Sequence, residues 1–240
     1  ESKVSGVIVQ VWEKEDRREL RFGNHIMQSV ISKIRPDMLV LPYSRFMLLG
    51  LLFCPEPKSV LHIGLGGGSI VRWMHREFPE LQQTVIEINS AVIEAAHRFF
   101  ELPKDKRLRV LCADAAEMIP TLTDKYDLII LDAFGDYGPP EELTRIEFLH
   151  KLRGCLHDDS WLVGNLWTVT GDFKERREQW KSTFNQVLGA RANRKGNVIL
   201  LGSQLSQLPE KQQFETTAKI LQKRHQIDFR KMLRELHAFT

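Results

Sequence analysis

Short apolar runs alternate with longer segments of mixed polarity through the middle of this chain. The runs have the length of buried strands, and the longer segments carry apolar residues at helical spacing. The predicted strands are 59–63, 84–88, 108–112, 127–131 and 160–165. The predicted helices are 70–78, 90–100, 115–120, 141–156 and 173–187. Such alternation favours right-handed βαβ units, so we predict a parallel sheet covered by helices.

The beginning of the chain has a different pattern, with apolar residues at every second position. Val7, Val9 and Val11 share one face of a predicted strand over 4–12. Other elements predicted here are short strands at 18–22 and 26–30, a turn at Asn24 and a helix at 43–54. We therefore expect a small β unit before the main fold.

The end of the chain also departs from the alternation. A turn at 193–197 lies between two apolar runs, 190–192 and 198–201, which predicts a closing antiparallel hairpin. Beyond Pro209, apolar residues recur at helical spacing and predict one or two amphipathic helices. This tail is basic. A helix face exposed to solvent explains the charge, and a surface that binds a partner is the alternative.

Together these patterns predict an α/β protein with a Rossmann-like, seven-stranded, methyltransferase-type sheet that contains one reversed strand. We divide the chain into a small N-terminal β unit (1–42), a Rossmann-like nucleoside-cofactor domain (43–204) and a helical tail (205–240).

Composition narrows the functional classes. A net charge of +3 over 240 residues is too small to favour a nucleic-acid partner. The longest apolar stretch, 46–54, is far shorter than a membrane span, so we expect no membrane partner. The three cysteines are too scattered for a disulfide framework or a metal cluster. We expect a cytoplasmic protein without a metal.

A glycine-rich loop, 64–69, joins the first predicted strand of the main fold to its helix. Gly64, Gly66 and Gly68 remove Cβ atoms and bring backbone N–H groups close to a ligand. The sixth position of the dinucleotide pattern is Ser69 rather than glycine or alanine. The spacing therefore favours an S-adenosyl-type ligand, and a tight turn without a ligand is the alternative.

Acidic residues follow the next strands, at the edge where parallel sheets bind ligands. Glu87 can accept hydrogen bonds from both ribose hydroxyls, or it is a surface residue at a strand end. Asp114 can accept from an adenine amine while the Ala115 N–H completes the base edge. Asp114 can also cap helix 115–120, and the two roles are compatible.

Asp132 ends the most apolar strand, where the reactive centre of such a ligand should lie. A carboxylate there stabilises a sulfonium or an ammonium cation. An alkyl amine has a pKa of about 10.4 and must lose a proton before it attacks carbon. Asp132 is therefore the candidate for orienting an amine and taking its proton, with positioning of loop 133–140 as the alternative. That loop, which includes Asp136, is expected to cover the site as an acidic gate.

These features resemble the spermidine synthase (polyamine aminopropyltransferase) family, especially its divergent bacterial spermidine synthase-like branch. The resemblance covers about residues 20–202 and includes the 41–45 stretch (Leu-Pro-Tyr-Ser-Arg), the glycine loop, the three acids and Gly138-Pro139. It implies an N-terminal β domain, a Rossmann-like domain and a homodimer. It also implies that Gln28, with the three acids, contacts decarboxylated S-adenosylmethionine or the amine, and that Tyr43 helps to place the reacting amine.

Two positions depart from the family pattern. The family's glycine loop usually carries an aspartate where this chain has Gly67, and the motif after the fourth strand carries a second aspartate where this chain has Gly135. In the family, both aspartates bind the charged tail of the ligand or the amine. Asp136 can replace the aspartate missing at position 135 only if the loop shifts.

We therefore predict aminopropyl transfer from decarboxylated S-adenosylmethionine to a small-molecule amine, which makes the protein a transferase. Methyl transfer from S-adenosylmethionine is one alternative, since the sheet order and glycine spacing permit it. A nucleoside-binding protein that has lost catalysis is the other, since two family carboxylates are missing.

Overall fold

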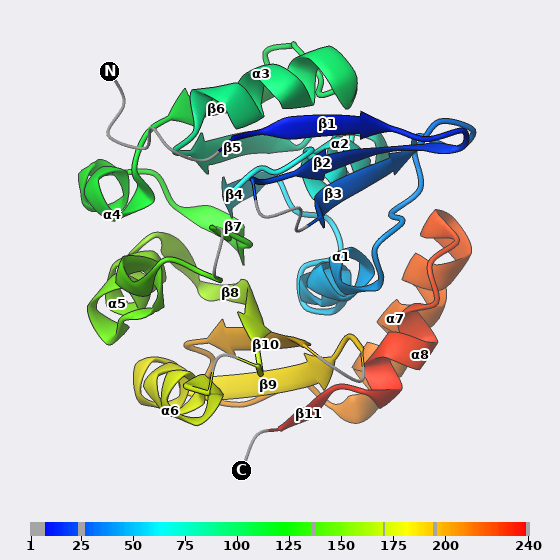
Figure 1. Ribbon diagram of the computed structural model, residues 1–240. Coiled ribbons are helices and arrows are strands. Elements are labelled where there is room, and N and C mark those ends of the chain that lie inside the picture. Colours follow the sequence, from blue (N-terminus) through cyan, green and yellow to red (C-terminus); the bar gives the residue numbers. More distant parts are fainter. Residues whose placement is uncertain (1–7, 24–26, 136–137, 170, 194–195, 239–240) are drawn as a thin grey trace.

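The computed structural model describes residues 8–23, 27–135, 138–169, 171–193 and 196–238. A large sheet runs through the molecule and carries helices on both faces (Figure 1). Its strands are β4 (Ser59–Ile63), β5 (Gln82–Glu87), β6 (Leu108–Cys112), β7 (Tyr126–Leu131), β8 (Leu156–Trp167), β9 (Gln186–Arg191), β10 (Asn197–Ser203) and β11 (His237–Ala238). The spatial order is β11-β9-β10-β8-β7-β4-β5-β6.

The sheet confirms the predicted fold class. Strands β4 to β8 pair in parallel, whereas β10 pairs antiparallel with both β8 and β9. Strands β4 to β10 thus form the expected seven-stranded methyltransferase-type sheet, in which β10 is the reversed strand. The two-residue β11 adds an eighth strand beside β9, which the sequence pattern did not predict.

Helices pack on the two faces because successive strand residues point in opposite directions and both are apolar. Val60, Leu128 and Val163 belong to one core cluster, and their neighbours Leu61 and Ile129 belong to the other. The first face is covered by α1 (Pro42–Phe46), η1 (Met47–Leu52), α7 (Lys211–His225) and α8 (Phe229–Arg234). The second face is covered by α4 (Ala115–Met118), η2 (Ile119–Thr121), η3 (Glu141–Thr144), α5 (Ile146–Gly154) and α6 (Phe173–Thr183).

The small N-terminal sheet consists of β1 (Gln10–Glu13), β2 (Arg17–Arg21) and β3 (Met27–Ser32), all antiparallel. Its apolar face, with Leu20 and Ile31, packs in a third cluster with α3 (Ser90–Phe99) and with Val71 of α2 (Ser69–Glu77). The predicted strand over 4–12 is observed from Gln10 onward. Val7 and the predicted turn at Asn24 lie outside the described residues.

Predicted helix 115–120 is observed as α4 followed by the 3₁₀ helix η2, and three other predicted helices differ more. Segment 43–54 is one turn of α-helix followed by the 3₁₀ helix η1, in which Gly50 lies against Leu128 and Val163. Segment 141–156 divides at Arg145, and the following strand begins at Leu156 because it pairs with Tyr126. Helix 173–187 ends at Thr183, and the chain then pairs with β10 as β9. In each case packing on the sheet overrides local propensity.

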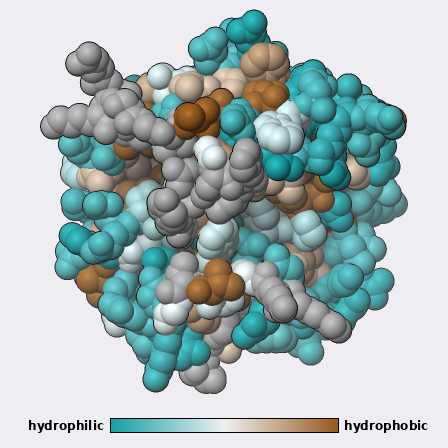
Figure 2. All heavy atoms as spheres, in the orientation of Figure 1, coloured by the Kyte–Doolittle hydropathy of each residue, from teal (hydrophilic) through white to brown (hydrophobic). Residues whose placement is uncertain are grey.

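The tail packs on the main core instead of standing apart. Ala218 and Leu221 of α7 and Phe229 and Met232 of α8 are buried in the same cluster as the first sheet face. The domain division at 42/43 and 204/205 stays a prediction. The face of the molecule in Figure 2 is mainly hydrophilic, with small and separate hydrophobic areas. No helix among the described residues is both long and apolar enough to cross a bilayer.

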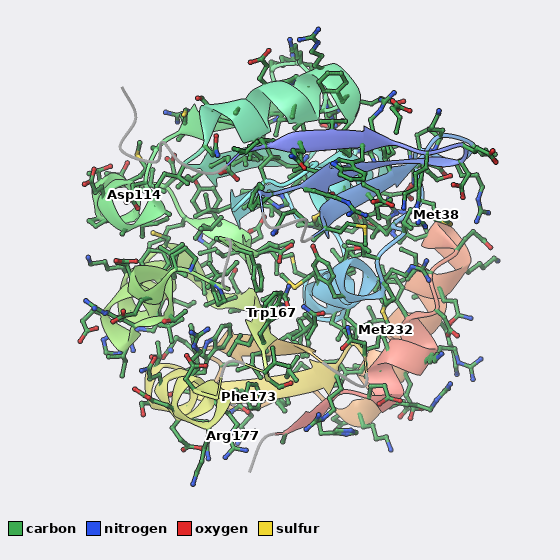
Figure 3. The ribbon with its side chains drawn as sticks, in the orientation of Figure 1. Met38, Asp114, Trp167, Phe173, Arg177 and Met232 are labelled. Carbon is green, nitrogen blue, oxygen red and sulfur yellow. The ribbon has the colours of Figure 1, made fainter. Side chains whose placement is uncertain are left out.

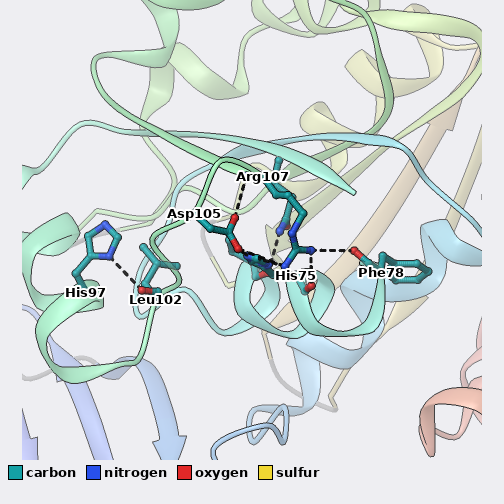
Figure 4. Close-up of polar contacts among 8 residues, drawn as sticks. His75, Phe78, His97, Leu102, Asp105 and Arg107 are labelled. Atoms are coloured by element: carbon teal, nitrogen blue, oxygen red, sulfur yellow. Dashed lines mark hydrogen bonds and ion pairs between the residues drawn. The ribbon is translucent and has the colours of Figure 1, made fainter. Parts of the chain in front are cut away.

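Helix α2, which follows the glycine loop, is anchored at its C-terminal end by polar contacts (Figure 4). Arg107 donates through Nη1 to the His75 backbone oxygen at 2.9 Å, and its Nη2 lies 3.1 Å from His75 Nε2. The Asp105 carboxylate lies 2.9 Å from the same His75 nitrogen. These contacts tie the loop before β6 to α2 and so fix the helix whose first turn borders the site.

Candidate active site

A cavity of about 340 Å³ opens at the carboxyl ends of β4, β5 and β7. This is within the size range of small-molecule sites. Its polar walls come from β3, α1, the glycine loop and the ends of the parallel strands. The predicted site residues that line it are Gln28, Tyr43, Gly64, Gly66, Glu87, Asp114, Ala115 and Asp132. The three carboxylates, which are far apart in sequence, therefore meet in one cavity.

The glycine turn needs glycine at two of its predicted ligand positions for different reasons. Gly64 has a φ of +89°, and a Cβ there would lie 2.4 Å from the Asp132 backbone oxygen. The chain after β4 therefore touches the chain after β7 with no space for a side chain. Gly68 has a φ of +69° and is the residue just before α2. It does not belong to the cavity lining, so the structure places it as a turn residue behind the site.

Glu87 lies at the end of β5 and organises the loops on either side. Its Oε2 accepts the Leu65 N–H at 3.0 Å, and its Oε1 accepts the Asn89 N–H at 2.9 Å. Burial raises the pKa of this carboxyl, and these backbone donors lower it. The backbone N–H groups of Ile88 and Gly66 also stabilise its charge, so Glu87 holds the glycine loop and the chain after β5 together at the edge of the cavity.

Asp114 performs the capping role and also faces the cavity. Its Oδ1 accepts the Ala116 N–H at 2.8 Å at the start of α4, where Figure 3 shows the residue. Ala115 is buried beside it. The two roles weighed from sequence are thus compatible in space, since capping uses one of the two carboxylate oxygens.

Asp132 and Tyr43 form the polar centre of the cavity. The Tyr43 hydroxyl donates to the Asp132 carboxylate, and Asn165 Nδ2 donates to Asp132 Oδ1 at 2.9 Å. Burial raises the pKa of Asp132 from its ordinary value of 3.8 to about 6, although both hydrogen bonds oppose the rise. Burial and the neighbouring carboxylate also raise the pKa of Tyr43 well above its ordinary value. Tyr43 is therefore a neutral donor and Asp132 a weakened acid.

The positions of the two missing family aspartates differ in the structure. A Cβ at Gly67 would lie 2.7 Å from Ser29 Oγ and 2.9 Å from a ring carbon of Phe100. A side chain at 67 would therefore displace its neighbours. Gly135 lines the cavity and has space for a Cβ, with Gly138 O at 3.6 Å as the nearest contact. Asp136, the proposed substitute, lies outside the described residues, and the gate role of loop 133–140 stays a prediction.

Sequence reasoning did not assign two polar residues at the site. His62 of β4 is buried, with its Nε2 2.9 Å from Gln83 Oε1. It also lines the cavity. Asn165 lies near the carboxyl end of β8 and contacts Asp132 directly. The signal that could have found it is its place at the carboxyl end of the parallel strand that follows Asp132 in the chain.

The fold and the cavity define an α/β protein with a site of small-molecule size at the carboxyl edge of its parallel strands. Residues 43–188 match the family described as Spermine/spermidine synthase domain. The chain is 33% identical over 236 residues to a polyamine aminopropyltransferase of Neisseria meningitidis, which covers 96% of this chain and 89% of that protein. The chain therefore belongs to the spermine/spermidine synthase family, which confirms the predicted family and the predicted transferase class.

Solved structures agree with this fold. A probable spermidine synthase from Corynebacterium glutamicum has a TM-score of 0.78 at 20% identity, covering 92% of this chain and 84% of that one. Human methyltransferase-like protein 13, solved in complex with SAH, has a TM-score of 0.63 at 22% identity, covering 84% and 92%. At these identities the likeness shows the shared architecture, which the two classes of transferase have in common.

Proposed function

We propose that this protein transfers an aminopropyl group from decarboxylated S-adenosylmethionine to a small amine. The observation that carries the proposal is the Asp132–Tyr43 pair, which lies in the same cavity as the glycine turn and Glu87. Membership of the family supports the reaction type. The nearly complete alignment with the Neisseria aminopropyltransferase supports it further.

The residues of the cavity fit a nucleoside with a positively charged sulfur. Glu87 supplies a carboxylate for ribose hydroxyls, and Asp114 with the Ala115 N–H suits an adenine edge. Ile86, Ile88 and Leu143 add apolar walls for the base. Gln28 on β3 reaches the same cavity and supplies an amide. The ligand supplies an electrophilic methylene next to its sulfonium, to which an amine nitrogen bonds as the carbon–sulfur bond breaks and sulfur keeps the electron pair.

Asp132 is the group in this cavity that suits an amine acceptor. Its carboxylate attracts an ammonium ion, and its raised pKa brings it closer to the pKa required of a base at neutral pH. The Tyr43 hydroxyl holds one side of the carboxylate and leaves further lone pairs for the amine. We therefore assign Asp132 the role of orienting the amine and accepting its proton. Tyr43 has the role of placing the Asp132 carboxylate and the amine.

The direct test is to incubate the protein with decarboxylated S-adenosylmethionine and putrescine, spermidine or cadaverine, and to measure methylthioadenosine. Product with any one amine supports the proposal. Absence of product with every amine contradicts it. Calorimetry then separates the alternatives, because methyl transfer requires a clear preference for S-adenosylmethionine, and a binding protein retains methylthioadenosine without turnover.

The reaction is expected to require ionised Asp132, so kcat/KM should fall about tenfold per pH unit below pH 6. Protonated Asp132 cannot accept the proton of the amine. His62 does not titrate near pH 6, because burial lowers its pKa to about 4. A pH–rate profile with methylthioadenosine binding measured at the same pH values checks this. If binding falls in parallel, the ionisation belongs to the nucleoside site and the assignment to Asp132 is wrong.

Glu87→Gln is expected to weaken methylthioadenosine binding about 10- to 100-fold. The amide replaces one oxygen by an NH₂ group, which then faces the N–H of Leu65 or of Asn89. Calorimetric titration measures the change. Glu94→Gln on the exposed face of α3 is the matched control and should bind like the unchanged protein. Equal affinity in both variants would exclude Glu87 from the nucleoside site.

A homodimer and a cytoplasmic location stay predictions from the family resemblance and from composition. Light scattering of the purified protein tests the assembly. A mass of twice 27.8 kDa is expected, and a mass of 27.8 kDa at all concentrations contradicts a dimer.

A further inference from the structure

A row of side-chain amides runs from Asp132 to the turn between β9 and β10. Asn165 Nδ2 donates to Asp132 Oδ1 at 2.9 Å, and Asn197 Nδ2 donates to Asn165 Oδ1 at 2.9 Å. Asn193 Nδ2 then donates to Asn197 Oδ1 at 3.0 Å. Three amides from three parts of the chain thus form one continuous series that ends on the candidate catalytic carboxylate.

The sheet places these residues in line. Leu131 is in register with Gly164, which brings the following residues, Asp132 and Asn165, side by side at the carboxyl ends of β7 and β8. Asn165 is paired with Ile199 of β10, and Asn197 lies two residues earlier on the same face. Asn165 is also 6% exposed, so its amide depends on protein partners for its hydrogen bonds.

Both ends of the series favour one direction: the ionised Asp132 carboxylate can only accept, and at the far end a backbone donor fixes the direction whether or not Asp132 is ionised. The backbone N–H of Asn197 can only donate, and it donates to Asn193 Oδ1 at 3.2 Å. The other end of the Asn193 amide is therefore NH₂, which requires an oxygen from Asn197. The Asn197 NH₂ then requires the oxygen of Asn165, and the Asn165 NH₂ is left to face Asp132.

We propose that Asn193 and Asn197 are positioning residues that orient the Asn165 amide, so that the candidate catalytic carboxylate Asp132 always receives an N–H donor. The inference rests on the proposed function for its catalytic meaning, although the hydrogen-bond order is independent of any reaction. With the amide reversed, the oxygens of Asn165 and Asp132 would face each other, which disfavours the ionised carboxylate.

The charged and titratable groups around Asp132 are few within the described residues. Tyr43 donates to it from α1. The other titratable groups that line the same cavity are His62 of β4, Glu87 of β5, Asp114 before α4 and Glu142 of η3. Asn165 and Tyr43 are the hydrogen-bond partners that favour ionisation. The direction of one amide therefore has a large influence on when Asp132 is charged.

The test reverses the series at its far end. Asn193→Asp leaves an oxygen for the Asn197 N–H but presents a second oxygen to the Asn197 side chain. That side chain, and then Asn165, must turn over. Asn193 is exposed, so the variant should fold normally. Asn197→Asp produces the same reversal one step closer to the site. Asn185→Asp adds the same charge at the opposite end of β9, where Asn185 bonds the Gln204 backbone oxygen, and is the matched control.

The readout is the titration of the Asp132 carboxyl by carbon NMR, with its signal identified by its loss in Asp132→Asn. Both reversing variants should raise the pKa of Asp132 by about one to two pH units, the effect of losing a hydrogen bond to a charged group. The control should leave it unchanged. In an Asn165→Ala background, Asn197→Asp should have no further effect, because the amide that transmits the reversal is gone.

Two results would overturn the inference. An unchanged Asp132 titration in both reversing variants would show that the series does not set the direction of Asn165. An equal rise in the Asn165→Ala background would show that the added charge acts through space instead. Because the titration requires no substrate, absence of aminopropyl transfer in the unchanged protein would contradict the proposed function while leaving this test intact.

Discussion

Asp132→Asn is expected to lower kcat/KM for aminopropyl transfer by about 100- to 10,000-fold, the contribution typical of a positioned general base. The amide keeps the shape of the side chain and can still accept from Asn165 Nδ2. It cannot accept a proton from the amine, and it no longer attracts the ammonium ion. Steady-state kinetics at pH 8 measure the loss. A reduction below tenfold would remove Asp132 from the proton-accepting role.

The same substitution is expected to stabilise the folded protein at neutral pH. Burial raises the pKa of Asp132 from 3.8 to about 6, so the folded state binds its proton more tightly than the unfolded chain does. Ionisation of Asp132 therefore lowers the free energy of unfolding. The loss is complete above about pH 6 and absent below about pH 4. Because the side chain also borders the cavity, we expect Asp132→Asn to gain about 1 to 2 kcal/mol at pH 8, measured by urea unfolding. The gain should disappear near pH 4.

Asp127→Asn is the matched control, on the same strand but at its opposite end. Asp127 Oδ2 accepts the backbone N–H groups of Lys58 and Ser59, at 2.7 and 2.9 Å. Its substitution should cost about 1 kcal/mol of stability and leave kcat/KM unchanged. The two variants therefore have opposite signatures: one loses activity and gains stability, and the other loses stability alone. Equal behaviour of the two would contradict a special role for Asp132.

Gly64→Ala is expected to destabilise the protein by about 3 kcal/mol or more and to abolish methylthioadenosine binding. Its φ of +89° is unfavourable for alanine, and the new Cβ would lie 2.4 Å from a backbone oxygen of Asp132. To remove this clash, the ends of β4 and β7 must separate, and this displaces both the glycine turn and Asp132. Thermal unfolding and calorimetric binding measure both effects.

Gly154→Ala is the matched control, because a Cβ there would meet nothing within 4 Å. It should leave binding unchanged and alter stability by less than about 1 kcal/mol. If Gly64→Ala behaves like Gly154→Ala, the close approach of the two strand ends does not support the site.

Much of the candidate site was predictable because a parallel sheet converts sequence order into position. Glu87 and Asp132 each end or follow an apolar run, and the carboxyl ends of parallel strands meet at one edge. Their arrival in one cavity follows from that rule. The central strands β4 and β7 were equally predictable, because most residues on both of their faces are buried and their sequences are mainly apolar.

Other features depended on contacts that the local pattern does not contain. Gly68 fits the ligand spacing as well as Gly66 does, yet it lies behind the turn because its Cβ position faces Leu102. The 3₁₀ geometry of η1 arises from packing around Gly50. The short strand β11 arises because the tail returns to the edge of the sheet beside β9.

The sequence by itself determined the architecture and the chemical character of the site, because apolar periodicity and glycine placement are local properties. Only the tertiary structure decided how that site is tuned. The raised pKa of Asp132 results from burial by distant segments. The amide that faces it comes from β8, and the amide that bonds to that one comes from the start of β10. Hydrogen bonding and desolvation depend on distances in space, which the order of residues along the chain does not specify.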